Sequence, residues 1–276
     1  MRIMTYIGVF FALLITGTAL GQEETAVREE VVVNEESGSE YRTGLELYNR
    51  AEYDAAIACF QKSFELDGRN INALFAHGLA LGKLNRNAEA TVLFEQVLSR
   101  EPNHEKALRI LPTVLVAAGD PEGAMKAYDR AIAALPGDYS FYFGKAVILL
   151  NSEDYTAAIP LLEKAVSCAP ERIEILERLM YTYREAGDRE AAFTTAQKIL
   201  GVDDNQTYAR LICADYYREM GQYREALRNY ERAARDTETK AYADYYSRVI
   251  EQELEEMEIE EEYREMMERR RSGSER

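Results

Sequence analysis

Residues 221–233 read GQYREALRNYERA, a segment whose spacing recurs along the chain. An alanine follows the first glycine by five residues, a tyrosine follows that alanine by four, and another alanine follows by three more. Steps of four and three keep side chains on one face of an α-helix. The segment therefore predicts a helix with a buried stripe, preceded by a loop at Gly221.

The first alanine of this segment belongs to a column with a constant period. The same residue type stands in every copy, and each copy follows the one before by 34 residues without an insertion. The column consists of Ala56, Ala90, Ala124, Ala158, Ala192 and Ala226. A fixed period of this length indicates a repeat architecture, in which each unit buries its apolar stripe against the next.

Further columns keep the period and predict two helices in each unit. Four residues after the alanines, on the second helix, stand Phe60, Phe94, Tyr128, Leu162, Ala196 and Tyr230, and three residues further stand Ser63, Val97, Ala131, Ala165, Ile199 and Ala233. Nine residues before the alanines, on the first helix, stand Leu47, Leu81, Leu115, Leu149, Tyr183 and Tyr217. Prolines that end the second helix recur at Pro102, Pro136 and Pro170. Between the two helices, Gly119, Gly187 and Gly221 mark a loop that favours positive φ, with Glu, Asn or Ala in the other copies.

With this period and these columns, the chain resembles the tetratricopeptide repeat family over residues 37–238. The resemblance implies an all-α fold, a right-handed superhelical solenoid of six helix-turn-helix repeats. In that family a small residue at the eighth position lets the two helices of a hairpin approach closely. The corresponding small residues here are Gly44, Gly78, Ala146 and Ala214.

Two repeats depart from the family pattern. Pro112 removes an amide donor from the first helix of the third repeat, which predicts a kink or a displaced helix start. In the fifth repeat, Met180 fills the small position, while Ala196 and Asp204 fill the columns of Phe and Pro. These replacements put the tight packing of the fifth hairpin in question.

The sequence also predicts the nature of the segments outside the repeats. Residues 1–21 pair Arg2 with an apolar run and small residues, which predicts a secretory signal peptide, with an uncleaved membrane anchor as the alternative. Residues 22–36 predict an acidic flexible linker. Residues 239–268 predict a capping helix that becomes highly charged, and residues 269–276 a basic flexible tail. The stripe expected on the capping helix consists of Ala241, Tyr245, Tyr246, Val249, Ile250, Leu254 and Met257.

Charge and chemistry narrow the classes of function. The chain has 49 acidic and 33 basic residues, a formal charge of −16 that disfavours nucleic acid as a partner. Its two histidines and three cysteines show no metal-ligand or nucleophile spacing, and there is no Gly-rich phosphate loop. We therefore expect no enzymatic activity, no metal and no cofactor. Since Cys59, Cys168 and Cys213 fall in separate, non-adjacent repeats, we expect three free and largely buried thiols.

The resemblance also implies where a partner binds, because the first helices of tetratricopeptide repeats line a concave groove. Outward positions on those helices carry aromatic, Asn and Arg side chains, which anchor peptides. The candidate binding residues are Tyr41, Leu45, Tyr48, Asn49, Phe75, Leu79, Lys83, Lys106, Arg109, Phe143, Val147, Asn151, Glu177, Tyr181, Arg184, Tyr208, Asp215 and Arg218. The alternative for each is that it completes the packing between repeats.

The leading functional hypothesis is an exported, periplasmic or extracellular adaptor. It would hold a protein or peptide partner in the groove during assembly of an envelope or secretion machine. One alternative is a structural protein that self-associates through its Glu-rich C-terminal helix. Another is a solenoid that binds a peptide or glycan.

Overall fold

The structure is a computed structural model, and it describes residues 35–273. Every secondary-structure element in that range is an α-helix, which confirms the predicted all-α class. The predicted signal peptide and residues 22–34 of the predicted linker lie outside the described residues, while Glu35 and Glu36 already belong to the first helix. The right-handed coiling and the number of six repeats stay predictions.

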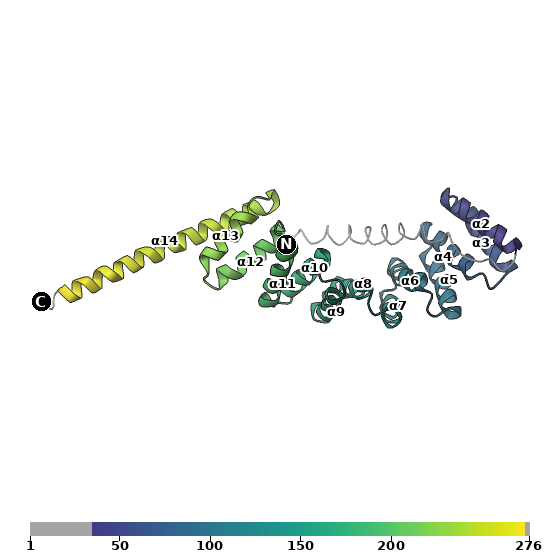
Figure 1. The fold of residues 1–276 in the computed structure, drawn as a ribbon, viewed down its shortest axis with the longest axis horizontal. Coiled ribbons are helices and arrows are strands. Elements are labelled where there is room, and N and C mark those ends of the chain that lie inside the picture. Colours follow the sequence, from purple (N-terminus) through teal and green to yellow (C-terminus); the bar gives the residue numbers. More distant parts are fainter. Residues whose placement is uncertain (1–34, 274–276) are drawn as a thin grey trace. The chain divides into compact units, whose positions relative to one another are not determined.

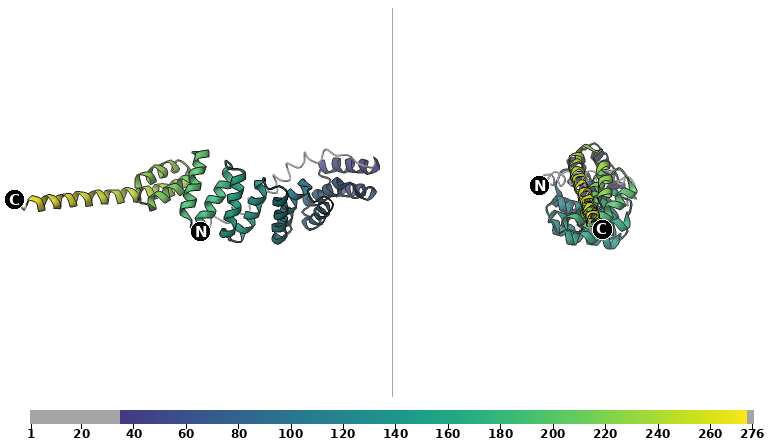
Figure 2. Two further views of the ribbon diagram at one scale, coloured as in Figure 1. Left: turned by 60° about the horizontal axis from the view of Figure 1, so that its bottom comes forward. Right: turned by 90° about the vertical axis from the view of Figure 1, so that its left-hand side faces the viewer.

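The chain divides into two compact units, one ending at Asp154 and one beginning at Tyr155. Consecutive helices in each unit run antiparallel (Figure 1 and Figure 2). In the first unit the helices are α2 (Glu35–Asn49), α3 (Tyr53–Leu66), α4 (Ile71–Lys83), α5 (Asn87–Arg100), α6 (Glu105–Ala117), α7 (Pro121–Ala134) and α8 (Tyr139–Asn151). In the second they are α9 (Tyr155–Cys168), α10 (Ile173–Glu185), α11 (Arg189–Val202), α12 (Thr207–Glu219), α13 (Tyr223–Ala233) and α14 (Thr237–Gly273).

The alanine column is buried along the whole array. Each of its six members is at most 2% exposed, and so is each residue of the column that runs from Ser63 to Ala233. The column that starts at Phe60 is buried as well. A small residue is required opposite Phe60, since a Cβ added to Gly44 would lie 2.6 Å from Cε1 of that ring. The spacing seen in the sequence therefore marks the core.

The fifth repeat stays well packed because its large and small residues have exchanged positions. Met180 on α10 and Ala196 on α11 are both fully buried and belong to the same core cluster. A large side chain at the small position is thus matched by a small one at the position of Phe. The two departures that put this hairpin in question compensate each other, because the pair fills about the same volume as a small residue facing a ring.

Pro112 does not displace the start of its helix. Helix α6 begins at Glu105, as the period predicts, and continues past the buried Pro112 to Ala117. Proline can lie inside a helix when the surrounding packing outweighs the one lost hydrogen bond. A second internal proline, Pro160, lies on the exposed side of α9.

The bend inside each hairpin has one left-handed residue. Gly119, Gly187 and Gly221 adopt φ of 82°, 83° and 69°, as the sequence predicted. The equivalent residues of the other copies also have positive φ, with values of 61° at Ala51, 58° at Asn85 and 60° at Glu153. The bend geometry is therefore kept even where the residue carries a side chain.

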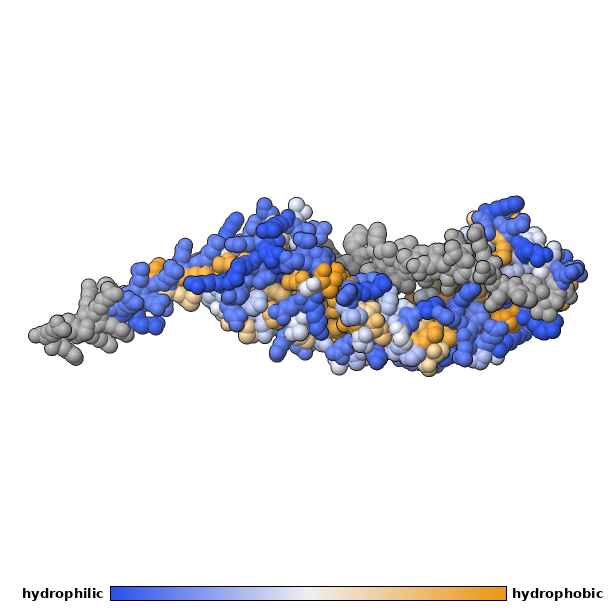
Figure 3. Space-filling model, viewed as in Figure 1, coloured by the Kyte–Doolittle hydropathy of each residue, from blue (hydrophilic) through white to orange (hydrophobic). Residues whose placement is uncertain are grey.

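Helix α14 packs against α13 and α12 and then extends past both of them (Figure 1). Its buried side is Thr239, Ala243 and Ile250, with Tyr246 and Leu254 partly buried. This corrects the predicted stripe, because Ala241 is exposed and Tyr245 and Met257 are 62% and 47% exposed. The helix continues to Gly273, beyond the boundary predicted at residue 268. In Figure 3 its exposed part is mostly hydrophilic.

Candidate binding surface

In the first unit, five predicted groove residues are buried rather than open. Tyr41, Tyr48, Phe75, Leu79 and Phe143 are between 2% and 8% exposed. Two of these rings pack on second helices, with ring centroids 5.9 Å apart for Tyr41 and Phe60 and 5.4 Å apart for Phe75 and Phe94. The expectation that these five side chains stand open to a partner is corrected, since aromatic positions on first helices add to the core between helices.

The remaining candidates of the first unit are partly or fully exposed. They are Leu45, Asn49, Lys83, Lys106, Arg109, Val147 and Asn151. Arg109 has partners within the unit, since its guanidinium donates to Glu105 at 2.8 Å and to Asp138. It also lies 5.6 Å from the ring centroid of Phe141. Its role is therefore to join α6 to the start of α8.

In the second unit, the predicted residues of α10 and α12 form a connected group. The rings of Tyr181 and Tyr208 meet edge to face, with centroids 6.5 Å apart. Arg184 lies over the ring of Tyr181, 5.0 Å from its centroid. The ring of Tyr208 is 45% exposed, and its hydroxyl reaches Glu238 on α14 at 3.3 Å. This face therefore has an aromatic pair that neighbours hold in place, with Tyr208 exposed and Tyr181 partly buried.

The group continues onto α14 through Asp215. Tyr242 donates its hydroxyl to the two carboxylate oxygens of Asp215 at 3.1 and 3.0 Å, and Tyr230 donates to the same carboxylate. Arg218 lies 4.6 Å from the ring centroid of Tyr246. We call the residues that line this face of α10, α12 and α14 the tyrosine surface; they are Tyr181, Arg184, Tyr208, Asp215, Arg218 and Tyr242.

Tyr242 is the member that sequence reasoning missed. It lies 34 residues after Tyr208, so the column of Tyr208 continues for one period past the predicted array. The residue is 41% exposed, and its partner Asp215 belongs to the preceding first helix. Extending the period onto the capping helix would have found it. Helix α14 therefore acts as a further first helix for this face.

Burial and nearby negative charges raise the pKa of acidic groups on and beside the tyrosine surface. Burial together with Glu177 raises the pKa of Tyr181 to about 12, which keeps its hydroxyl protonated at neutral pH. Burial also raises the pKa of Asp215, although the hydroxyls of Tyr230 and Tyr242 and the nearby Arg218 favour its charged form. The pKa of Glu177 is raised by burial and by Glu174. Asp215 on this surface and Glu177 beside it are therefore carboxyl groups whose negative charge nearby arginines and hydroxyls offset only in part.

Asp215→Asn is expected to change how stability depends on pH. Because the pKa of Asp215 is higher in the folded chain than in the unfolded chain, its ionisation costs stability above the folded pKa. This cost disappears as the pH falls through the folded pKa toward the ordinary value of 3.8. The wild type should therefore gain stability relative to Asp215→Asn on acidification. Urea denaturation of both chains from pH 7 to pH 3.5 would measure this, and a constant difference would contradict it.

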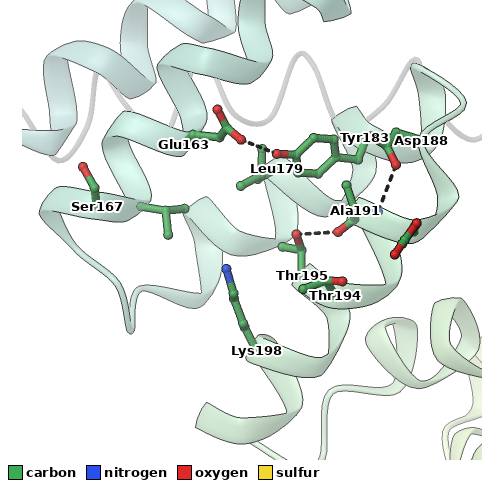
Figure 4. A pocket seen from close by; sticks show the side chains of 11 residues that line it. Glu163, Ser167, Leu179, Tyr183, Asp188, Ala191, Thr194, Thr195 and Lys198 are labelled. Atoms are coloured by element: carbon green, nitrogen blue, oxygen red, sulfur yellow. Dashed lines mark hydrogen bonds between the residues drawn. The ribbon is translucent and has the colours of Figure 1, made fainter.

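A separate open hollow of about 530 Å³ lies on α9, α10 and α11 (Figure 4). In it Tyr183 donates its hydroxyl to Glu163 at 2.6 Å, and Asp188 accepts from the backbone amide of Ala191 at 3.0 Å. Lys198 points into the hollow from α11. Burial and Glu163 raise the pKa of Tyr183, so this hydroxyl is a hydrogen-bond donor rather than a base. The lining of the hollow mixes apolar and polar side chains, and Glu163 and Asp188 in it serve local contacts.

Groups for catalysis are sparse in the part of the chain that the structure describes. Within residues 35–273, no cluster of His, Cys, Asp and Glu has the arrangement of a metal site. The three cysteines are free; Cys213 is buried, whereas Cys59 and Cys168 are only partly buried, which corrects the expectation for those two. Burial raises the pKa of Cys213 to about 12, the opposite of an activated thiol. His104 caps α6 by accepting from the backbone amide of Ala107 at 3.1 Å.

Comparison with known families identifies the repeat. The sequence model of the tetratricopeptide repeat matches residues 75–139 and 113–173, across the columns described above. This part of the chain consists of tetratricopeptide repeats. Among the helices of residues 35–273, none combines the length and the apolar character that a membrane span requires.

Curated relatives extend the tetratricopeptide repeat likeness beyond that stretch. A TPR repeat-containing protein of Methanocaldococcus jannaschii is 24% identical over 62% of this chain and 33% of its own length. Superkiller protein 3 of Schizosaccharomyces pombe is 24% identical over 70% of this chain and 14% of its own length. The chain therefore spans a third or less of these relatives.

Solved structures show the same tetratricopeptide solenoid fold. MamA from Desulfovibrio magneticus RS-1 has a TM-score of 0.55 and 21% identity, covering 63% of this chain and 98% of the other. Another MamA crystal structure has a TM-score of 0.57 and 20% identity, covering 62% of this chain and 94% of the other. At this identity the likeness concerns the fold.

Proposed function

We propose that this protein is a non-enzymatic scaffold that binds a partner peptide or helix on the tyrosine surface. The observation that carries the proposal is the set of exposed rings that contacts across three helices hold in place. Tyr208 and Tyr242 are 45% and 41% exposed, yet each hydroxyl is bonded to a carboxylate of a neighbouring helix. Rings fixed before binding lose little conformational entropy when a partner covers them.

The residue types on this surface suit recognition of another protein. Tyr and Arg dominate the residues that carry binding energy at protein interfaces, because they combine a large contact area with a polar tip. Two arginines lie beside tyrosine rings here, Arg184 at Tyr181 and Arg218 at Tyr246. Carboxylates between them provide acceptors for the backbone amides of a bound segment. A scaffold role also suits the tetratricopeptide repeats of the chain.

Export is the second part of the proposal. Its support is the sequence pattern of residues 1–21, in which an apolar run follows Arg2 and ends in small residues. An exported scaffold would meet its partner in the periplasm or outside the cell, where it could hold components during assembly of an envelope or secretion machine. Retention of the same segment would instead anchor the protein in the membrane.

Site-specific crosslinking in the native host tests the binding surface. We expect a photoreactive amino acid at position 208 or 242 to capture a protein, because both tyrosines are exposed members of the tyrosine surface. The matched control is position 202, since Val202 is 45% exposed on α11 in the same unit and outside the tyrosine surface. Capture at position 202 with the same protein and yield, or no capture at 208 and 242, would contradict the proposal.

Tyr208→Ala with Tyr242→Ala is expected to weaken binding of the captured partner at least about tenfold, since buried interface tyrosines typically contribute more than about 1 kcal/mol. The chain should stay folded, because the two residues are 45% and 41% exposed and neither belongs to the buried core. Val202→Ala should leave the dissociation constant unchanged. Fluorescence anisotropy with the labelled partner and circular dichroism of each variant would separate lost binding from lost folding.

A further inference from the structure

The turn between α11 and α12 and the end of α13 enclose a second, smaller pocket of about 230 Å³. It is lined by the side chains of Arg210, Arg232 and Arg235, together with Asp204, Asp236 and Thr207. Three guanidinium groups against two carboxylates leave one positive charge, in a chain whose formal charge is −16. This pocket is separate from the residues of the tyrosine surface.

Arg210 is fixed before any ligand arrives. Its side chain is 5% exposed, and its guanidinium donates to the main-chain carbonyl of Asp204 at 3.0 and 2.7 Å. Asn229 on α13 accepts a further, longer bond at 3.5 Å. A guanidinium held by backbone and side-chain acceptors keeps its position when the carboxylate beside it moves.

One carboxylate bridges two of the three arginines. Asp204 accepts from Arg210 through one oxygen and from Arg232 through the other. Its side chain is 57% exposed, so it can turn toward solvent without being buried elsewhere. The second carboxylate, Asp236, accepts from the backbone amide of Glu238 at 2.8 Å and so caps α14. Neither carboxylate is paired with Arg235.

Among the described residues, none accepts a hydrogen bond from the guanidinium of Arg235. Its side chain makes no hydrogen bond or ion pair within residues 35–273, although it lines the same pocket as the bridged pair. The pocket has several times the roughly 30 Å³ that a water molecule occupies in the liquid. It therefore has room for an oxyanion that accepts from Arg235 and Arg232 at once.

We propose that this pocket binds a small oxyanion, either a phosphate or a carboxylate group. The oxyanion would accept from Arg235 and Arg232, and the exposed Asp204 carboxylate would turn aside to share Arg210 with it. Guanidinium groups suit this ligand because their paired N–H donors match two oxygens of a phosphate or carboxylate. The hydroxyl of Thr207 offers one more donor from the start of α12.

Titration of the full chain with inorganic phosphate, followed by amide NMR shifts, tests this site. Chloride at the same ionic strength is the reference, because a general salt effect would appear with both ions. Phosphate should produce saturable shifts at Asn205, Thr207 and Asp236, and chloride should not. Acetate in place of phosphate shows whether a carboxylate suffices or a phosphoryl group is needed. Identical responses to phosphate and chloride would overturn the proposal.

Point variants distinguish phosphate binding in the pocket from a general effect of the positive charges on α13. Arg235→Ala should weaken phosphate binding about tenfold, the loss expected for a hydrogen bond to a charged group. The matched control is Arg228→Ala, since Arg228 is an exposed arginine on α13 whose partner is Glu225. Asp204→Asn should tighten binding, because it removes the competing charge while leaving the backbone acceptor of Arg210. Equal affinities for Arg235→Ala and Arg228→Ala would overturn the proposal, whatever the state of the tyrosine surface.

Discussion

Met180→Ala is expected to lower the free energy of unfolding by about 2 to 5 kcal/mol, because it empties a fully buried position of the fifth repeat. Ala196→Phe alone should also destabilise, by about 1 to 3 kcal/mol, because a ring would be forced against Met180. Combining the two changes recreates the pairing of a small residue with a ring. The double variant should therefore be more stable than the sum of the single effects predicts, by about 1 kcal/mol or more.

Urea denaturation followed by far-ultraviolet circular dichroism measures this coupling. Lys198→Ala, an exposed change on the same helix as Ala196, should alter stability by less than about 0.5 kcal/mol. Since repeat arrays can unfold in stages, the transitions of all variants must be compared for shape as well as midpoint. Additive effects of Met180→Ala and Ala196→Phe would mean that the two positions do not compensate each other.

Phe94→Ala is expected to have a comparable cost, about 3 to 5 kcal/mol, in the second repeat. The ring of Phe94 is 1% exposed, and a Cβ built on Gly78 would lie 2.9 Å from its Cε1. Its centroid also lies 5.4 Å from that of Phe75, so truncation removes an aromatic contact along with the core volume. The cavity would open beside Gly78, where α4 and α5 pack together.

Adding Gly78→Met to Phe94→Ala imposes on the second repeat the arrangement found in the fifth. We expect this second change to restore part of the lost stability, since the methionine chain can enter the space that the ring leaves. Val92→Ala is the control, because Val92 is 55% exposed on the same helix. Thermal unfolding of the four chains measures the effect. A loss below about 1 kcal/mol for Phe94→Ala would contradict the packing described here.

The core was predictable because the period fixes which residues share an interface. A constant step of 34 aligns Ala56 with Ala226 without any gap, and both are fully buried. The loop glycines were predictable for the same reason, since only a left-handed residue continues the chain into the second helix at that point. Each of these inferences depends on local spacing, which a sequence states directly.

The candidate binding residues were harder to predict because exposure depends on how neighbouring helices cover one another. Phe75 and Tyr208 both lie on first helices, yet the first is 3% exposed and the second 45%. Periodicity places each on an outward face and does not say how much of that face a neighbour covers. The stripe of α14 was assigned incorrectly for a related reason, since Tyr245 reads as apolar although its ring lies in solvent.

The bends between the two helices of each hairpin are places where the stability of the fold could be increased. Holding a side-chain-bearing residue at positive φ costs about 1 kcal/mol relative to glycine, and Ala51, Asn85 and Glu153 all occupy that conformation. Natural selection has therefore left half of the bends short of their most relaxed residue. Replacing these three residues by glycine is therefore a route to a more stable scaffold, since none of them belongs to the alanine column or to the tyrosine surface.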